Sequence, residues 1–209
     1  MPRSQEGLAR LIDRDRLDDD RITAAFRSID RKVFVPSEFR ARAYEDRPVG
    51  IPAQQTTSQP SLIARMIDAA RVPPGGRALE VGTGYGFQTA LLARLCREVY
   101  SIERHPELAA QAESNLRAAG ITNATVTVGD GWAGWPEHAP YDAIVVSAAA
   151  SEVPDALRDQ LAEGGRLVIP VTEGASDNVY LFVKTDGATR LVRLLTPARF
   201  VPLVKEPPS

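Results

Sequence analysis

Apolar and polar residues alternate along the chain with two different periods. A spacing of three and four residues, typical of a helix with one buried face, occurs at residues 5–30, 60–71, 86–96, 106–119 and 154–161. Short apolar runs that fit buried strands occur at residues 77–81, 98–102, 124–128, 142–147 and 166–171. The repeated strand–helix alternation predicts an α/β fold with a doubly wound, mostly parallel sheet and helices on both faces.

The two ends of the chain depart from this alternation. Residues 36–60 are interrupted by four prolines, which predicts a loop with short extended pieces. The C-terminal part is rich in β-forming residues, and we expect antiparallel strands that close the sheet at residues 179–184, 190–195 and 199–203. Because 209 residues suit one domain, we expect a single domain over 1–209, divided into an N-terminal helical and loop cap at 1–60 and a core at 61–209.

The composition narrows the classes of protein that remain. The single cysteine excludes an internal disulfide framework, and with only two histidines no typical zinc site is expected, so we predict no metal. A net charge of −2 gives no general attraction to nucleic acid or to anionic lipid. The charged N-terminus lacks the apolar core of a signal peptide, and no apolar run is long enough to span a membrane. We therefore expect a cytoplasmic protein that binds neither nucleic acid nor membranes.

A glycine-rich turn follows the first predicted core strand. It reads Glu80-Val81-Gly82-Thr83-Gly84-Tyr85-Gly86, and a predicted helix begins directly after it. The pattern is G-x-G-x-G, whereas the dinucleotide fingerprint is G-x-G-x-x-G and places a pyrophosphate at a helix N-terminus. An acid at the head of the turn suits a cofactor with positive charge, such as S-adenosylmethionine with its sulfonium and ammonium groups.

Acidic residues also follow the next two predicted strands. Glu103 ends the second one, about 20 residues beyond the glycines, where a carboxylate can accept hydrogen bonds from both ribose hydroxyls. Asp130 follows the third, where it can accept from an adenine amino group or lie beside it. Taken singly, Glu103 also fits a solvated surface acid and Asp130-Gly131 a plain turn. Three acids at three successive strand ends favour a cofactor-binding crevice.

The arrangement resembles the Rossmann-like class I S-adenosylmethionine-dependent methyltransferases. The segment Gln55-Thr56-Thr57-Ser58-Gln59-Pro60 narrows the resemblance to the protein-L-isoaspartate O-methyltransferase family. The resemblance covers residues 8 to 204, and its other matching segments are 43–48, 79–84, 100–104, 129–131, 139–144, 160–165 and 199–203.

The resemblance implies a set of site residues. Ser58 is the residue expected to be catalytic, and Thr57, Ser58, Val201 and Pro202 are expected to bind the substrate. The expected cofactor-binding residues are Glu80, Gly82, Thr83, Gly84, Gln88, Glu103, Arg104, Asp130 and Gly131. From the residues alone, Ser58 also fits the N-cap of the helix that follows it.

The resemblance also implies a reaction. The family methylates the α-carboxyl of L-isoaspartyl residues in damaged proteins and peptides, and the ester closes to a succinimide whose hydrolysis restores some normal aspartate. A carboxylate is already a nucleophile, so no general base is needed, and catalysis consists of positioning. The partners implied are isoaspartyl-containing proteins or peptides, and we expect a monomer.

Three departures from the family pattern keep other functions open. Pro52 and Gln54 stand where the family has glycines, and Tyr85-Gly86-Phe87 stands where it has Ser-Gly-Tyr. A methyltransferase for another carboxylate, on a dedicated peptide or a small molecule, is therefore an alternative, as is a relative that binds the cofactor without catalysis. A nucleic-acid amino-methyltransferase is disfavoured, because Ser147-Ala148-Ala149-Ala150 replaces its Asn/Asp-Pro-Pro-aromatic motif.

Overall fold

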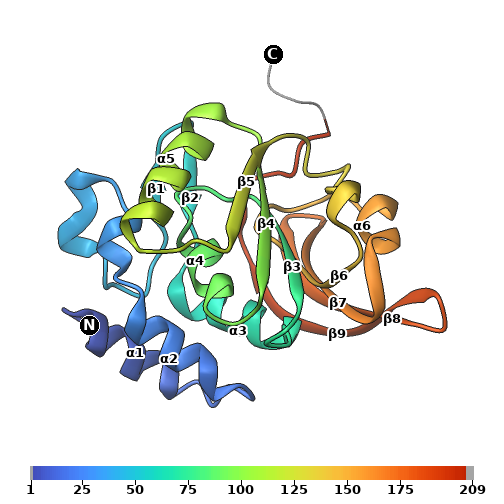
Figure 1. Ribbon diagram of the computed structural model, residues 1–209, viewed down its shortest axis with the longest axis horizontal. Helices are drawn as coiled ribbons and strands as arrows, with labels where there is room; N and C mark the ends of the chain where they lie inside the picture. Colours follow the sequence, from blue (N-terminus) through green and yellow to red (C-terminus); the bar gives the residue numbers. More distant parts are fainter. Residues whose placement is uncertain (1, 206–209) are drawn as a thin grey trace.

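A seven-stranded sheet runs through the computed structural model of this chain, which describes residues 2–205 (Figure 1). The strands stand in the order β5-β4-β3-β6-β7-β8-β9. Neighbours from β5 to β7 pair in parallel, whereas β8 and β9 are antiparallel to their neighbours. Their bounds are β3 Arg77–Val81, β4 Glu98–Glu103, β5 Ala124–Val128, β6 Tyr141–Val146, β7 Leu161–Glu173, β8 Ser176–Thr185 and β9 Ala188–Ala198. The predicted α/β class, with a mostly parallel sheet and antiparallel C-terminal strands, is confirmed.

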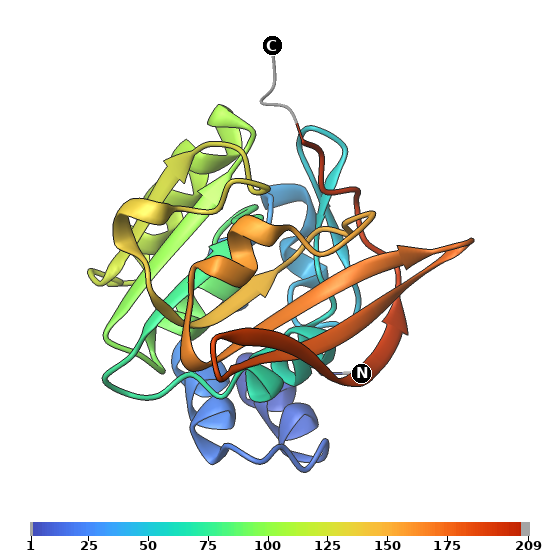
Figure 2. The same cartoon turned by 90° about the vertical axis from the view of Figure 1, so that its right-hand side faces the viewer.

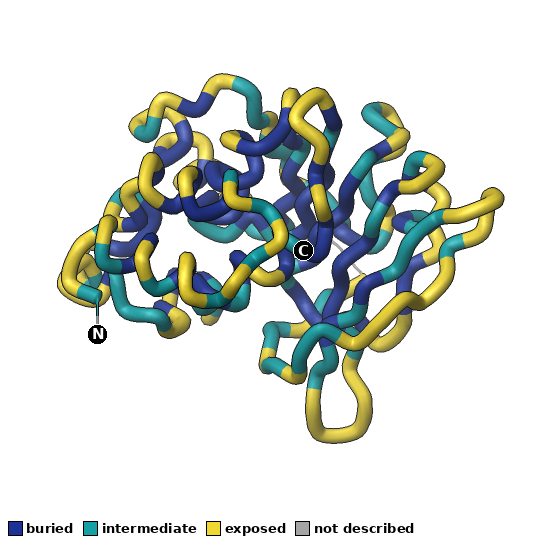
Figure 3. Tube along the Cα trace, turned by 90° about the horizontal axis from the view of Figure 1, so that it is seen from below, coloured by how far each residue is buried: buried dark blue, intermediate teal, exposed yellow. Residues whose placement is uncertain are grey.

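Helices cover both faces of this sheet (Figures 1 and 2). Within residues 2–205, five α-helices belong to one face and one short α-helix to the other. Successive strand residues alternate between the two resulting cores, so that Ala78 packs with the larger helical layer and Leu79 with the other. The larger layer contains α1 Gln5–Asp13, α2 Asp20–Ser28, α3 Pro60–Ala70, α4 Phe87–Ala93 and α5 Pro106–Ala118, and the opposite face carries α6 Asp155–Asp159. Figure 3 shows buried chain through the centre of the molecule and exposed chain along its outer loops.

The segment between α2 and α3 forms two 3-10 helices and a short hairpin. It contains the 3-10 helices η1 Arg31–Phe34 and η2 Ser37–Arg42 and the hairpin of β1 Val49–Ile51 and β2 Gln55–Thr57. A further 3-10 helix, η3 Pro136–His138, precedes β6. At the hairpin turn, Ala53 and Gln54 have φ angles of 56° and 57°, in the left-handed region that favours glycine. The structure therefore places one of the two departures from the family's glycines, Gln54, in a conformation that suits glycine.

Three sequence predictions were wrong in their extent. Residues 5–30 form two helices, because α1 ends at Asp13 and Asp19 caps a separate α2 by accepting a hydrogen bond from Arg21 N. The helix predicted at 154–161 ends at Asp159, and β7 begins at Leu161. Residues 199–203 make only an isolated bridge between Pro202 and Ala149, because Val201 O and Leu203 N bond to Ala149 in the loop after β6 and not to a strand of the sheet.

No helix within residues 2–205 combines the length and apolar content that crossing a membrane requires.

Candidate functional site

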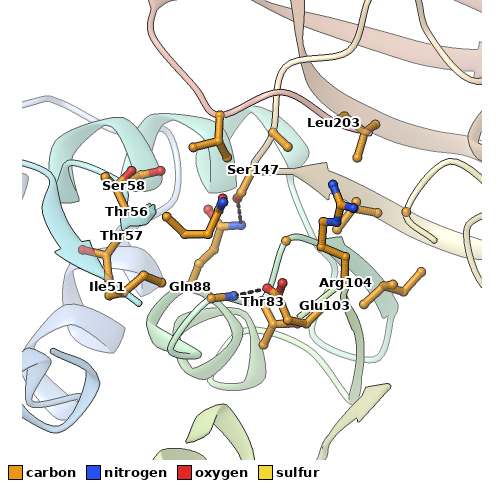
Figure 4. Close-up of a pocket in the computed structure, with 18 of the residues that line it drawn as sticks. Ile51, Thr56, Thr57, Ser58, Thr83, Gln88, Glu103, Arg104, Ser147 and Leu203 are labelled. Carbon is orange, nitrogen blue, oxygen red and sulfur yellow. Dashed lines mark hydrogen bonds between the residues drawn. The ribbon is translucent and has the colours of Figure 1, made fainter. Parts of the chain in front are cut away.

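A pocket opens at the carboxyl ends of β3, β4 and β6 (Figure 4). The chain runs from β3 outward to β5 and then returns to place β6 on the other side of β3, and such a switch of strand order leaves a crevice at the sheet edge. The hairpin β1–β2 and the segment after β9 form the opposite wall of the pocket. In Figure 4, Thr56, Thr57 and Ser58 lie across the cavity from Glu103 and Arg104.

The glycine-rich turn after β3 forms the floor of the pocket. Gly82 has a φ of +92°, and a Cβ added to it would lie 3.4 Å from the Cβ of Ser147 at the end of β6. The turn is tied to the next strand because Gly82 N donates to the carbonyl oxygen of Ile102 over 2.8 Å. A side chain at Gly82 would therefore be strained and would crowd β6, which explains a glycine at this point.

Glu103 is the one of the three strand-end acids whose side chain lines this pocket. It is 5% exposed. Its Oε2 accepts from Gly84 N over 2.8 Å, and its Oε1 accepts from His105 N over 3.0 Å. A carboxylate offers about four acceptor positions, so each oxygen keeps capacity for a ligand hydroxyl. The same carboxylate thus orders the glycine turn and faces the cavity.

Glu80 lies beneath the pocket and is fully buried. It accepts hydrogen bonds from Gln88 Nε2 over 3.0 Å, from Ser101 Oγ over 2.6 Å and from Thr89 Oγ1. Burial raises the pKa of its carboxyl group to about 7, although these three hydrogen bonds oppose the rise. Glu80 therefore reaches the pocket only through its neighbours.

Gln88 is the neighbour that links Glu80 to the cavity wall. Its Nε2 also donates to Ser147 Oγ over 2.9 Å, so both amide hydrogens are used (Figure 4). Its Oε1 is buried and accepts no hydrogen bond from the part of the chain that the structure describes. Such an acceptor beside a pocket suits a ligand that brings a donor of its own.

The raised pKa of Glu80 gives a prediction about stability. Between about pH 4.5 and 7 the folded chain holds a proton that the unfolded chain has released, so the free energy of unfolding falls as the pH rises, by about 1.4 kcal/mol per unit. We expect Glu80→Gln, which cannot titrate, to lack this decline. Above pH 7, Glu80 is ionised in the folded and in the unfolded chain, so the free energies of unfolding of wild type and Glu80→Gln should differ by a constant amount. Urea unfolding at a series of pH values measures it.

The control for this measurement is Glu107→Gln, on the exposed side of α5. This variant should follow the wild-type pH profile throughout. Parallel profiles for wild type and Glu80→Gln between pH 4.5 and 7 would contradict the raised pKa.

Arg31 is a buried cation that organises the wall opposite Glu103. Its guanidinium donates to the carbonyl oxygens of four residues and to Thr57 Oγ1, which lies 3.0 Å away. The carbonyl acceptors, at 2.9–3.2 Å, belong to Ala43, Glu45, Arg47 and Ser58. Its Cζ also lies 5.6 Å from the ring centroid of Phe87 at the start of α4. Burial lowers the pKa of Arg31 to about 10, so it stays charged at neutral pH. Arg31 was not among the residues predicted from the sequence.

Ser58 and Thr57 line the pocket together with Val201 and Pro202. The alternative that Ser58 caps the following helix was wrong, because Gln59 is the N-cap of α3 and Pro60 is its first residue. The carboxylate of Asp46 instead serves the first turn of that helix, accepting from Ser61 N over 2.8 Å. The Ser58 side chain therefore lines the pocket and does not cap α3.

Asp130 does not line this pocket, although Gly129 and Gly131 on either side of it do. Its Oδ1 accepts from Trp132 N over 2.9 Å, which closes a tight turn at the pocket edge. A Cβ added to Gly131 would lie 2.3 Å from Val81 Cγ1, so only glycine fits there. The remaining predicted residues line the cavity: Gly82, Thr83, Gly84, Gln88, Glu103, Arg104 and Gly131 with Thr57, Ser58, Val201 and Pro202.

Comparison with known sequences gives one consistent result. A sequence model of the family described as protein-L-isoaspartate(D-aspartate) O-methyltransferase (PCMT) matches residues 3–207. A protein-L-isoaspartate O-methyltransferase from Gloeobacter violaceus is 47% identical over 190 residues, which cover 90% of this chain and 92% of that protein. A protein-L-isoaspartate O-methyltransferase from Opitutus terrae is 48% identical over 199 residues, which cover 95% of this chain and 84% of that protein.

Comparison with solved structures agrees with the sequences. A structure described as a protein-L-isoaspartate O-methyltransferase superposes with a TM-score of 0.86 at 31% identity. The superposition covers 95% of this chain and 65% of the chain in that structure. This chain thus spans about two thirds of that protein. A PCMT structure from Plasmodium falciparum, described as a complex with S-adenosyl-L-homocysteine, gives a TM-score of 0.82 at 27% identity over 98% and 100% of the two chains.

Proposed function

This chain belongs to the protein-L-isoaspartate O-methyltransferase family, and from this premise we propose that it methylates the α-carboxyl of L-isoaspartyl residues in proteins and peptides, with S-adenosylmethionine as the methyl donor. The observation that carries the proposal is one continuous pocket that joins Glu103 and the glycine turn to Ser58 and Val201. A cofactor bound against Glu103 and the glycine turn would face a substrate held by Ser58 and Val201.

The residues present fit the proposed cofactor. Glu103 offers carboxylate oxygens to the ribose hydroxyls, and the unpartnered Oε1 of Gln88 offers an acceptor to the ammonium group. Glu80 supports Gln88 from behind, which places a carboxyl group near the methionine end without direct contact. Asp130 and Arg104 would border the adenosine. When bound, S-adenosylmethionine supplies an electrophilic methyl group on its sulfonium.

The remaining task of the protein is to orient the acceptor. An isoaspartyl carboxylate is ionised at neutral pH and needs no general base, so the Ser58 hydroxyl and nearby backbone N–H groups would hold it in line with the methyl carbon. Thr57 Oγ1 accepts from Arg31 and keeps its own hydrogen to donate, so Thr57 would flank the bound peptide beside Ser58. The methyl ester formed would close to a succinimide, and hydrolysis of that ring repairs part of the damage. We further propose one domain over residues 1–209, with 1–60 covering the site, that acts as a monomer.

The decisive experiment compares two peptides that differ in one linkage. Labelled S-adenosylmethionine is offered with matched isoaspartyl and aspartyl peptides, and base-labile label is expected on the isoaspartyl peptide alone. Ser58→Ala should lower kcat about 10- to 100-fold, since one hydrogen bond to a charged group contributes about 1.5–3 kcal/mol. The cofactor Kd should stay within about threefold, because that change corresponds to less than 1 kcal/mol.

The matched control is Ser37→Ala in η2, where the Ser37 hydroxyl donates to Glu38 on the surface. It should leave kcat and the cofactor Kd unchanged. Cofactor binding without label on either peptide would overturn the proposed activity and favour a relative that binds the cofactor without catalysis.

A further inference from the structure

A second groove continues the candidate site toward the surface. It shares Thr56, Ser58, Ser147 and Val201 with the main pocket and runs between the start of α3 and residues 196–200. If Ser58 holds the isoaspartyl carboxylate as proposed above, the substrate polypeptide on one side of the isoaspartyl residue leaves the site through this groove. Its lining can then distinguish one substrate sequence from another.

The charged side chains that line the groove are both arginines. Arg65 projects from α3 with a side chain that is 53% exposed, and Arg199 is exposed just beyond the end of β9. Among the described residues that line the groove, none is Asp or Glu. The lining is otherwise polar or apolar, so its two formal charges have the same sign.

Three carboxylates lie close to the groove, and each already has partners. Asp15 accepts from Arg65 Nε over 3.2 Å and from one of its Nη atoms over 3.3 Å, which leaves the other Nη of Arg65 to the groove. Asp46 accepts from Ser61 N over 2.8 Å and from Gln59 Nε2 over 2.9 Å. Asp177 accepts from Phe200 N over 2.9 Å and from Thr172 Oγ1 over 2.8 Å. Because Asp46 and Asp177 are turned to these donors, Arg199 and the free part of Arg65 determine the charge that a peptide meets.

We propose that Arg65 and Arg199 are specificity residues that favour isoaspartyl substrates carrying an acidic side chain close in sequence to the damaged residue. The inference rests on the proposed function, because it takes the groove to hold the flanking peptide. Exposed pairs of this kind are individually weak and screened by salt. The expected preference is therefore about two- to tenfold in affinity, and it should shrink at high ionic strength.

The test uses isoaspartyl peptides of one length whose residues on either side of the isoaspartate are Glu, Gln or Lys. Their Kd values are measured in the presence of S-adenosyl-L-homocysteine, and their kcat/KM values with S-adenosylmethionine. Binding should follow the order Glu, Gln, Lys from tight to weak. Arg65→Gln and Arg199→Gln should each reduce the ratio between Glu and Lys peptides, and the double variant should bring it near one.

Two further variants sharpen this test. Asp15→Asn releases Arg65 from its ion pair and should increase the preference for the Glu peptide. Arg117→Gln, a control whose side chain is 71% exposed on α5, should change nothing. Equal Kd values for the three peptides, or a preference that survives in the double variant, would overturn the inference about the groove. Absence of methyl transfer to every isoaspartyl peptide would overturn the proposed function instead, while the Kd ratios still decide the role of the two arginines.

Discussion

Arg31→Met is expected to lower the free energy of unfolding by about 3–5 kcal/mol and to abolish most methyl transfer in the protein that remains folded. The guanidinium of Arg31 is fully buried and supplies donors to four carbonyl oxygens and to Thr57 Oγ1. A thioether offers no donor, and each buried acceptor left without one costs about 1–3 kcal/mol. Burying methionine instead of a cation recovers part of this loss, which keeps the expected effect below the sum.

The activity should fall because these acceptors belong to the wall of the site. Ser58 is held through its carbonyl oxygen and Thr57 through its hydroxyl, so without Arg31 the end of β2 loses five of the hydrogen bonds that hold it against residues 43–47 and keeps those of the β1–β2 hairpin and of Asp46. A carboxylate that must lie in line with a methyl carbon tolerates little displacement. Urea unfolding gives the stability, and kcat/KM measured well below the unfolding temperature gives the positioning effect.

Two variants separate charge from geometry. Arg31→Lys keeps the charge but has three donors and no planar fork, so it should recover only part of the stability. Arg27→Met, on the exposed side of α2, should unfold like the wild type. An Arg31→Met protein with wild-type stability and kcat/KM would show that the buried guanidinium does not hold this wall.

Local pattern was sufficient to predict most of the sheet. The strands predicted at 77–81 and 124–128 coincide with β3 and β5, because short apolar runs bounded by turn residues carry their own signal. Residues 199–203 have the same apolar character, but they make only a single bridge, with Ala149 in the loop after β6. The bridge partner is about 50 residues away in the chain, and no local pattern marks such a contact.

The candidate site shows the same limit at the level of side chains. The rule that acids at strand ends gather at one edge located Glu80, Glu103 and Asp130, but it does not say where each carboxylate points. The carboxylate of Glu103 lines the pocket, that of Glu80 lies beneath it, and that of Asp130 closes a turn beside it. The carboxylate of Glu80 bonds to Ser101, 21 residues away in the chain, whereas that of Asp130 bonds to Trp132 N, two residues away. Neither partner follows from the position of the acid at a strand end.

Arg31 could not be predicted for a related reason. Its neighbours in sequence are charged and helical, which is typical of an exposed arginine, whereas its acceptors lie between residues 43 and 58. The N-cap role of Ser58 failed in the same way, since the acceptor that serves the first turn of α3 comes from Asp46. In both cases the side chain's role depends on hydrogen-bond partners that lie more than ten residues away in the chain.

Glu103→Ala is expected to weaken the binding of S-adenosylmethionine about 100- to 10,000-fold. In the proposed complex its carboxylate accepts from two ribose hydroxyls, and each hydrogen bond to a charged acceptor contributes about 1.5–3 kcal/mol. The substitution also frees Gly84 N and His105 N, which the carboxylate holds at 2.8 and 3.0 Å, so the glycine turn loses its anchor. Isothermal titration with S-adenosylmethionine measures the loss, and urea unfolding without ligand checks that the variant is folded.

Glu103→Gln separates the two contributions to this loss. It keeps the shape and one acceptor oxygen, but its amide must direct a donor either at a backbone N–H or at the ribose, so an intermediate Kd is expected. Because ligand stabilises the folded chain by RT ln(1 + [L]/Kd), saturating S-adenosylmethionine should raise the urea midpoint in the order wild type, Glu103→Gln, Glu103→Ala, from largest to smallest. Glu107→Gln, four residues along the chain and exposed on α5, should match the wild type. A Kd for folded Glu103→Ala within about threefold of wild type, a difference of less than 1 kcal/mol, would rule out Glu103 as the ribose acceptor.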